Sequence, residues 1–316
     1  MLWRLAILSA AIADVGAAAK YLYLILNFPH RIIRMDMDGQ NQVVLLDGLG
    51  HPHGIAVDDL HKKLYFGVSD DKSDRLMRSD LTGRNLEELV EDVHLGGVAV
   101  DAVNQHIYWT ELSEGRVQRS KLDGSEVETL VTDLQDPGGL DLDVAAGRLY
   151  WCDQDGWDAD SKGRIQTSLL NGSGLSVLHE ARFPMDLALD AANQKLYWTD
   201  AGTFELTRCN LDGTEVEVIQ NKSEAVNQSA KKGRHITGLL DPHGILLDHR
   251  GKIYFTLLGT AYSTKIGGPS ISRNGKLQRC NLDGSELETL AEFGSTQPVS
   301  LALSAVDAEI GMDGEL

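Results

Sequence analysis

Apolar segments of strand length recur along the chain and are separated by turn-forming residues. Three of them repeat in register: an apolar segment such as Gly97-Val-Ala-Val-Asp101, an aromatic segment such as Ile107-Tyr-Trp-Thr-Glu111, and a segment that ends in a turn, such as Arg119-Ser-Lys-Leu-Asp-Gly124. Short alternating segments divided by Asp-Gly or Asn-Gly predict antiparallel hairpins. No long segment keeps the 3.6-residue period of a helix, so the pattern predicts an all-β fold.

The repeat predicts how these strands are assembled. The three segments occur six times, and a weaker fourth segment such as Leu287-Glu-Thr-Leu290 follows each set. Four strands per unit at a spacing of about 42 residues are typical of a β-propeller. One blade cannot cover both of its faces, so six blades must pack around an axis to bury the Tyr-Trp pairs. Residues 21–26 and 298–304 each supply part of a blade, and we expect them to share one and close a six-bladed propeller.

The charge of the chain limits its partners. The sequence contains 47 acidic and 29 basic residues, which gives a formal net charge of −18. Nucleic acids and anionic membrane surfaces attract basic patches, so we expect neither as a partner. After residue 13, no apolar segment is long enough to cross a bilayer, so we expect no membrane span. The oligomeric state stays open.

The N-terminal segment predicts the cellular compartment. A short basic start, an apolar run over residues 5–13 and the small residues Ala17-Ala-Ala19 predict a signal peptide over residues 1–19. A buried N-terminal strand or a short helix is the alternative. We expect a single propeller domain over residues 20–316 in the secretory pathway, secreted or luminal. Sequons at Asn171, Asn221 and Asn227 are expected glycosylation sites.

The cysteines allow one disulfide at most. The chain contains Cys152, Cys209 and Cys280, and no Cys-x-x-Cys pair that would indicate structural zinc. Cys209 and Cys280 hold the same register in consecutive blades, which places them too far apart to pair. We therefore expect a Cys152–Cys209 disulfide and a free Cys280.

The aromatic segments resemble a known repeat. Tyr197-Trp-Thr-Asp200 and Ile107-Tyr-Trp-Thr-Glu111, with the Asp-Gly turns that follow, are similar to the YWTD repeats of the low-density lipoprotein receptor family. The resemblance covers about residues 20–310 and implies a six-bladed propeller. It says little about function, because one fold supports many functions.

A secretory YWTD propeller of this kind also resembles the fungal hetero-Diels–Alderases of tropolone-sesquiterpenoid biosynthesis, in architecture and compartment rather than in a local motif. This resemblance implies a cyclase without a cofactor, which joins a quinone methide to a terpene polyene. Its partners would be small apolar polyketide–terpenoid substrates. Orientation supplies up to roughly 7–11 kcal/mol to such a reaction. A charged hydrogen bond to the carbonyl group adds about 1.5–3 kcal/mol.

The site of such a cyclase is expected at one mouth of the central channel. Loops that enter the inner strands and loops between the second and third strands meet there. The candidate catalytic donors are His53, His243, Arg182 and Lys265. The candidate substrate-binding residues are Phe183, Met185, Trp157, Phe204, Tyr262 and Asp136. His53 and His243 occupy equivalent loops, and the alternative role for each is to cap a carbonyl group of a neighbouring blade.

Two other functions stay open. A secreted binding module would recognise a protein or a glycan through the same face, and it predicts an exposed aromatic patch without turnover. A metal-dependent lactonase would use carboxylates at the axis, and Asp141 and Asp186, helped by Asp136, are the candidates. A deep apolar cavity would favour the cyclase. The Asp residues that end the inner strands, with Glu111 and Asp200, are expected to be structural.

Overall fold

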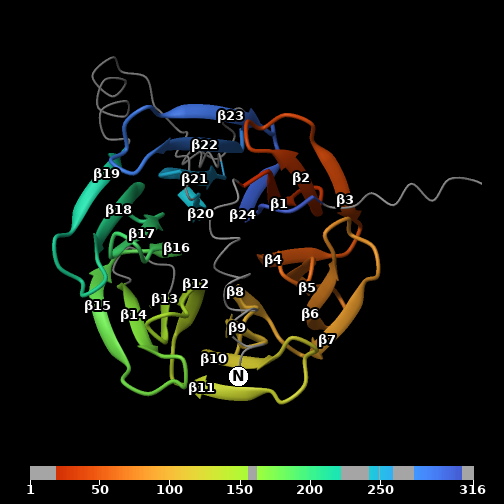
Figure 1. Cartoon of the computed structure of the whole chain (residues 1–316), viewed down its shortest axis with the longest axis horizontal. Coiled ribbons are helices and arrows are strands. Elements are labelled where there is room, and N and C mark those ends of the chain that lie inside the picture. Colours follow the sequence, from red (N-terminus) through yellow and green to blue (C-terminus); the bar gives the residue numbers. More distant parts are fainter. Residues whose placement is uncertain (1–18, 156–161, 222–241, 249, 259–273, 308–316) are drawn as a thin grey trace, which may run out of the picture.

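The computed structural model describes residues 19–155, 162–221, 242–248, 250–258 and 274–307. In this part of the chain, 24 strands form six four-stranded antiparallel sheets arranged around one axis (Figure 1). The C-terminal strand β24 (Gln297–Ser304) pairs with β1 (Tyr21–Asn27), so the two ends of the ring share one blade. The predicted six-bladed propeller and its closure are confirmed.

Each blade runs from an inner strand at the axis to an outer strand at the rim. The inner strands, besides β24, are β4 (His51–Asp58), β8 (Leu95–Asp101), β12 (Asp136–Asp143), β16 (Pro184–Asp190) and β20 (Pro242–Leu247). The second strands, besides β1, are β5 (Lys63–Ser69), β9 (His106–Glu111), β13 (Arg148–Gln154), β17 (Lys195–Asp200) and β21 (Lys252–Leu257).

The remaining two strands of each blade lie towards the rim. The third strands are β2 (Arg31–Asp36), β6 (Asp74–Asp80), β10 (Arg116–Lys121), β14 (Gly163–Leu169), β18 (Glu205–Asn210) and β22 (Lys276–Asn281). The outer strands are β3 (Val43–Asp47), β7 (Glu87–Glu91), β11 (Glu128–Val131), β15 (Ser176–Ala181), β19 (Glu217–Asn221) and β23 (Glu288–Glu292). We number the blades from 1, which holds β24 and β1–β3, to 6, which holds β20–β23.

The core lies between neighbouring blades. Trp109 of blade 3 is fully buried against Tyr65 and Leu95, and Trp198 of blade 5 packs in one cluster with Tyr150 of blade 4. Successive residues of a strand point to opposite faces, so each Tyr-Trp pair serves two interfaces. Because these aromatic side chains are buried on both faces of a blade, each blade needs a neighbour on either side, and the circle of blades must close.

The carboxylates of the repeat are structural, as expected. The Asp200 carboxylate accepts backbone N–H groups of Arg182 (2.9 Å), Phe183 (3.1 Å) and Gly202 (2.8 Å). Asp101, at the end of an inner strand, accepts the N–H of Asn104 at 2.9 Å. These bonds satisfy loop donors that would otherwise lie unpaired beside the core.

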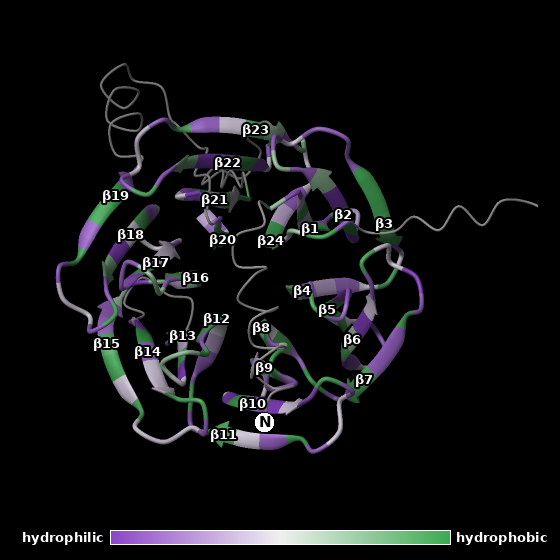
Figure 2. Cartoon of the chain, viewed as in Figure 1, coloured by the Kyte–Doolittle hydropathy of each residue, from purple (hydrophilic) through white to green (hydrophobic). Residues whose placement is uncertain are grey.

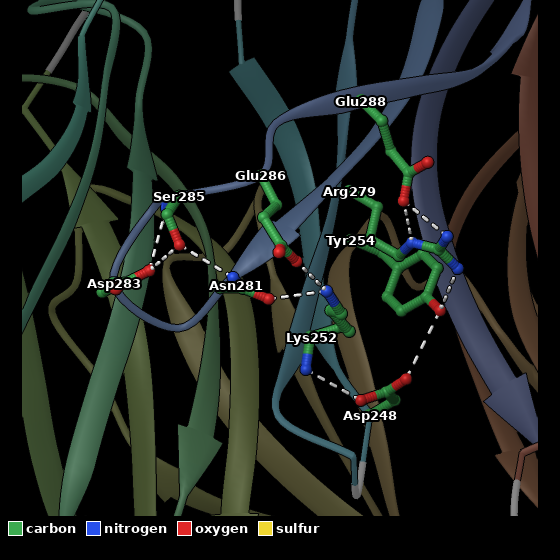
Figure 3. A network of polar contacts seen from close by, with 9 residues as sticks. All are labelled: Asp248, Lys252, Tyr254, Arg279, Asn281, Asp283, Ser285, Glu286 and Glu288. Atoms are coloured by element: carbon green, nitrogen blue, oxygen red, sulfur yellow. Dashed lines mark hydrogen bonds and ion pairs between the residues drawn. The ribbon is translucent and has the colours of Figure 1, made fainter.

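At the rim, arginines of the third strands link four blades to their neighbours. The guanidinium Nη1 atoms donate to backbone carbonyls of the next blade, in the pairs Arg78–Leu122, Arg119–Leu170, Arg208–Leu282 and Arg279–Met37. Figure 3 shows the last of these arginines, whose Nε also donates to Glu288 at 2.6 Å. The Tyr254 hydroxyl lies between Arg279 and Asp248, 3.3 Å from each. Blade 4 has Thr167 at the equivalent position, and its hydroxyl donates to Leu149 of its own sheet.

The outer strands expose some hydrophobic side chains. Figure 2 shows hydrophobic segments on β3 and β15, where Val44 and Val177 are about half exposed. Exposed hydrophobic side chains are distributed over all six blades, and single ones are normal on a protein surface.

The predicted Cys152–Cys209 disulfide is wrong, because both residues are buried free thiols. They belong to one hydrophobic cluster between blades 4 and 5, but they lie at different ends of it. Cys152 is near Asp153, Asp186 and Asp200, on the side where β16 begins, whereas Cys209 is near Asp212 and Lys195, at the hairpin turn. Burial raises the pKa of Cys209 to about 11, so this thiol is protonated at neutral pH.

Candidate functional site

The six inner strands surround a cavity of about 620 Å³ on the axis of the ring. This volume lies in the range of pockets that bind small molecules. Its wall includes apolar side chains from every inner strand, such as Val57, Val98, Leu140, Leu187 and Ile245. Among the described residues that line it there is no Lys or Arg. The cavity therefore combines an apolar wall with a few placed polar groups.

Both predicted histidines line this cavity, but neither is a charged donor. Nδ1 of His243 lies 2.7 Å from the backbone carbonyl oxygen of Val299 and donates to it, which confirms the capping alternative for this residue. His53 packs against His94, with ring centroids 5.2 Å apart. Burial, together with the neighbouring His94 and His51, lowers the pKa of His53 to about 4, and burial lowers the pKa of His243 to about 4. Both imidazoles are therefore neutral at pH 7.

Two carboxyl groups, Asp141 and Asp186, interrupt the apolar wall. Asp141 accepts the N–H of Leu142 at 2.7 Å and that of Leu189 at 2.9 Å. Asp186 accepts the N–H of Leu187 at 2.9 Å and that of Ile245 at 3.1 Å. Burial raises the pKa of Asp141 to about 6 and that of Asp186 to about 7, despite these bonds. The pKa of each group is thus much closer to physiological pH than that of an ordinary carboxyl group.

Sequence reasoning missed Gln154, a further residue of the cavity wall. Its side chain is only 4% exposed, and Nε2 donates to the carbonyl oxygen of Pro184 at 2.9 Å. Its Oε1 is buried and has no hydrogen-bond partner in the part of the chain that the structure describes. Buried polar atoms without a partner are rare in proteins, so Oε1 is a candidate ligand contact. The signal in the sequence was present: Gln154 directly follows the Asp of the aromatic segment.

The other predicted site residues that the structure describes are divided between the cavity and places away from it. Met185 and Asp136 line the cavity. Arg182 instead lines a second cavity of about 480 Å³ between blades 4 and 5, beside Trp198. Phe183 is buried at 7% exposure, and Phe204 lines neither cavity. The Asp200 carboxylate fixes the backbone of Arg182 and Phe183, which explains their position away from the axis. Trp157, Tyr262, Lys265 and Asn227 lie outside the described residues.

The described carboxylates do not form a complete metal site. Across residues 19–155, 162–221, 242–248, 250–258 and 274–307, no group of three or more His, Cys, Asp or Glu side chains is arranged to hold a metal ion. The lactonase alternative required a third ligand beside Asp141 and Asp186, and the described residues offer none of these kinds. The same residues include no helix that is long and apolar enough to cross a bilayer.

An aromatic cluster lies beside the cavity. Phe28, in the loop between β1 and β2, is 52% exposed, and its ring centroid is 5.2 Å from that of His30 and 6.2 Å from that of His51. The rings of His30 and His51 are 3.7 Å apart. Asn27 and His53, which flank the cluster in sequence, line the central cavity, so we call Phe28, His30 and His51 the mouth cluster. The binding-module alternative predicted an exposed aromatic patch, and Phe28 is an exposed aromatic side chain in this cluster.

Comparisons with known proteins support the repeat and the fold. Residues 105–144 match the low-density lipoprotein receptor repeat class B. The vitellogenin receptor Yl of Drosophila melanogaster is 30% identical over 193 residues, which are 58% of this chain and 9% of that protein. The protein cueball of Drosophila yakuba is 30% identical over 161 residues, or 48% of this chain and 24% of that protein. The matched regions thus span a tenth to a quarter of these relatives.

Solved structures show the same architecture. A chain in the crystal structure of a nidogen/laminin complex superimposes with a TM-score of 0.70 and 21% identity, and the match covers 90% of this chain and 98% of that one. TolB from Acinetobacter baumannii superimposes with a TM-score of 0.65 and 14% identity, over 94% of this chain and 71% of that one. At these identities the likeness concerns the fold alone. The chain is therefore a six-bladed β-propeller that carries a low-density lipoprotein receptor class B repeat.

Proposed function

We propose that this chain is a non-catalytic binding module of the secretory pathway, and that it recognises a protein through the mouth cluster. The exposed Phe28 ring carries this proposal. Aromatic side chains held in place by their neighbours are frequent anchors of protein interfaces. Phe28 meets this description, because half of its surface is exposed while His30 and His51 contact its ring.

The relatives point in the same direction. One of them, the vitellogenin receptor Yl, is described as a receptor. The exposed sequon residues Asn171 and Asn221 are compatible with glycosylation and with a secretory location, which stays part of the proposal.

The cyclase hypothesis has the apolar cavity in its favour, but the rest of its predicted site has less support. It required a charged donor and aromatic walls at one place, but Arg182 and Phe183 lie away from the central cavity. The two histidines that do line the cavity are neutral at pH 7, so they offer at most a neutral hydrogen bond to a substrate carbonyl.

A pair of matched positions tests the proposal. A photo-cross-linking amino acid is placed at Phe28 in one protein and at Leu60 in another. Leu60 is 50% exposed and lies in the hairpin between β4 and β5, at the opposite end of the strands. We expect position 28, and not position 60, to cross-link a secreted protein of the same organism, which mass spectrometry identifies.

The affinity of the purified partner then decides. Loss of an aromatic anchor costs about 2 kcal/mol or more, which is roughly a 30-fold weaker Kd for Phe28→Ala. Leu60→Ala should bind within a factor of two of the wild type. Equal cross-linking at both positions, or wild-type affinity of Phe28→Ala, would show that the mouth cluster is not the binding surface.

A further inference from the structure

Asp141 and Asp186 stand where the repeat places small residues. At the position of Asp186, blades 2, 3, 4 and 6 have glycines, namely Gly54, Gly97, Gly139 and Gly244. At the position of Asp141, blades 1, 2, 3 and 5 have alanines, namely Ala302, Ala56, Ala99 and Ala188. The two acids therefore depart from the repeat on adjacent inner strands. A purely structural ring would not need them, because the other blades close without them.

The two carboxyl groups both lie at the contact between β12 and β16, where Asp141 of β12 accepts the N–H of Leu189 in β16. A Cβ atom added to Gly139 would come within 1.9 Å of Oδ1 of Asp186, so only glycine fits next to this side chain. The charge of Asp141 makes a smaller contribution than burial to the raised pKa of Asp186. They form one acidic site where β12 and β16 meet.

Each carboxylate keeps acceptor capacity after its backbone bonds. A carboxylate has about four lone-pair sites. Asp141 and Asp186 each accept two described backbone N–H groups. Gln154 adds a separate acceptor to the same cavity, since its buried Oε1 has no partner in the described chain. The cavity thus contains several acceptors, whereas the described wall offers no Lys or Arg to meet them.

We propose that the central channel binds a small alkylammonium ligand, with its ammonium group at Asp141 and Asp186, Gln154 as a further acceptor, and its hydrocarbon part against the apolar wall. An ammonium group supplies three donors and a positive charge, which offsets the free-energy cost of the partly buried carboxylates. The cavity volume of about 620 Å³ exceeds the volume of a single side chain and lies in the range of pockets that bind small molecules. The site is independent of the protein-binding function proposed above.

Isothermal titration calorimetry of the whole chain with hexylamine and with hexan-1-ol tests the charge requirement. The two probes have the same carbon chain, so they differ in the ammonium group. We expect hexylamine to bind at least tenfold more tightly than hexan-1-ol. In a series of alkylamines, the affinity should rise roughly threefold to fourfold for each methylene group that enters the apolar wall.

Variants locate the binding site. Asp186→Asn should weaken hexylamine at least tenfold and leave hexan-1-ol unchanged, and Asp141→Asn should act in the same direction. The matched control is Asp71→Asn, because this exposed residue changes the net charge equally and does not line the cavity. Circular dichroism checks that each variant folds, and Gln154→Met replaces any Asp variant that does not fold, with a smaller expected loss.

Three results would overturn the proposal. They are equal binding of hexylamine and hexan-1-ol, no binding of hexylamine by the folded wild type, and an equal effect of Asp186→Asn and Asp71→Asn. Because Phe28 is not one of the residues that line the cavity, these results leave the protein-binding test unaffected.

Discussion

Four blades carry the same arginine link at the rim, whereas the inner strands differ from one another at the axis. Arg78, Arg119, Arg208 and Arg279 make one kind of bond to the next blade. At the axis, glycine and alanine give way to Asp186 in blade 5 and to Asp141 in blade 4. One polar contact thus recurs in four of the six blades at the rim, whereas each of the two acidic residues at the axis occurs in a single blade.

This difference separates the residues that hold the ring from those that serve a ligand. A contact that recurs in several blades needs no function beyond packing, because each blade must bury its faces against a neighbour. A partly buried carboxyl group that occurs in one blade alone costs free energy, and packing does not explain it. The comparison predicts that substitutions in the repeat reduce stability at any pH, whereas substitutions at the axis change its pH dependence.

The largest expected effect belongs to the repeated core. Trp109 is fully buried between blades 2 and 3, and Trp109→Ala should lower the free energy of unfolding by about 3–5 kcal/mol. The control is Val127→Ala, at a side chain that is 46% exposed, which should change it by less than about 0.5 kcal/mol. Urea unfolding followed by circular dichroism measures both. A loss below about 1 kcal/mol for Trp109→Ala would show that the repeat does not hold the ring.

This core was predictable from the sequence because its signals are local and repeated. Each copy of the aromatic segment gave independent evidence for the same strand, and the Asp-Gly turns fixed the hairpins between them. The positions of the two end segments in the repeat were enough to predict that β24 and β1 share a blade. The predicted pairing of Cys152 with Cys209 failed because the two residues lie at different ends of the cluster between blades 4 and 5. The repeat does not show at which end of such a cluster a cysteine side chain lies.

The second expected effect concerns the acidic site. The folded protein keeps a proton on Asp186 up to a pKa of about 7, whereas the unfolded chain loses it near 3.8. The folded state therefore binds more protons between these pH values, and the free energy of unfolding falls as the pH rises from about 4 to about 7. Asp186→Asn removes this dependence. From pH 4 to pH 8, its stability relative to the wild type should improve by roughly 2–4 kcal/mol.

Urea unfolding at several pH values measures this difference, and neighbouring groups set the control. The pKa of Asp141 is also raised, so its own contribution to the pH dependence has the same sign and persists in the Asp186→Asn variant. His53 and His243 act with the opposite sign, because their lowered pKa values make the folded state lose stability as the pH falls from 6.5 towards 4. Asp71→Asn should leave the pH profile unchanged. A parallel profile for Asp186→Asn and the wild type would mean that Asp186 is charged and compensated in the folded protein.

The candidate site was less predictable than the fold, for a physical reason. The sequence placed His53, His243, Met185 and Asp136 near the axis, because their loops are defined by the repeat. It could not show that the Asp200 carboxylate binds the backbone of Arg182 and Phe183 and holds them elsewhere. Nor could it show that Asp186 lies over Gly139, since that contact joins two blades.

The smallest of these effects belongs to the rim. Arg279→Met removes the bond to the Met37 carbonyl and the ion pair with Glu288, but it keeps an aliphatic side chain of similar length. These groups are partly exposed, so we expect a loss of only about 1–2 kcal/mol, equal at pH 4.5 and pH 8. Lys121→Met is the control, because its pair with Glu126 lies within one blade and should matter by less than about 0.5 kcal/mol. Equal losses in the two variants would mean that the rim arginines contribute no more than ordinary surface ion pairs, and that the buried interfaces alone close the ring.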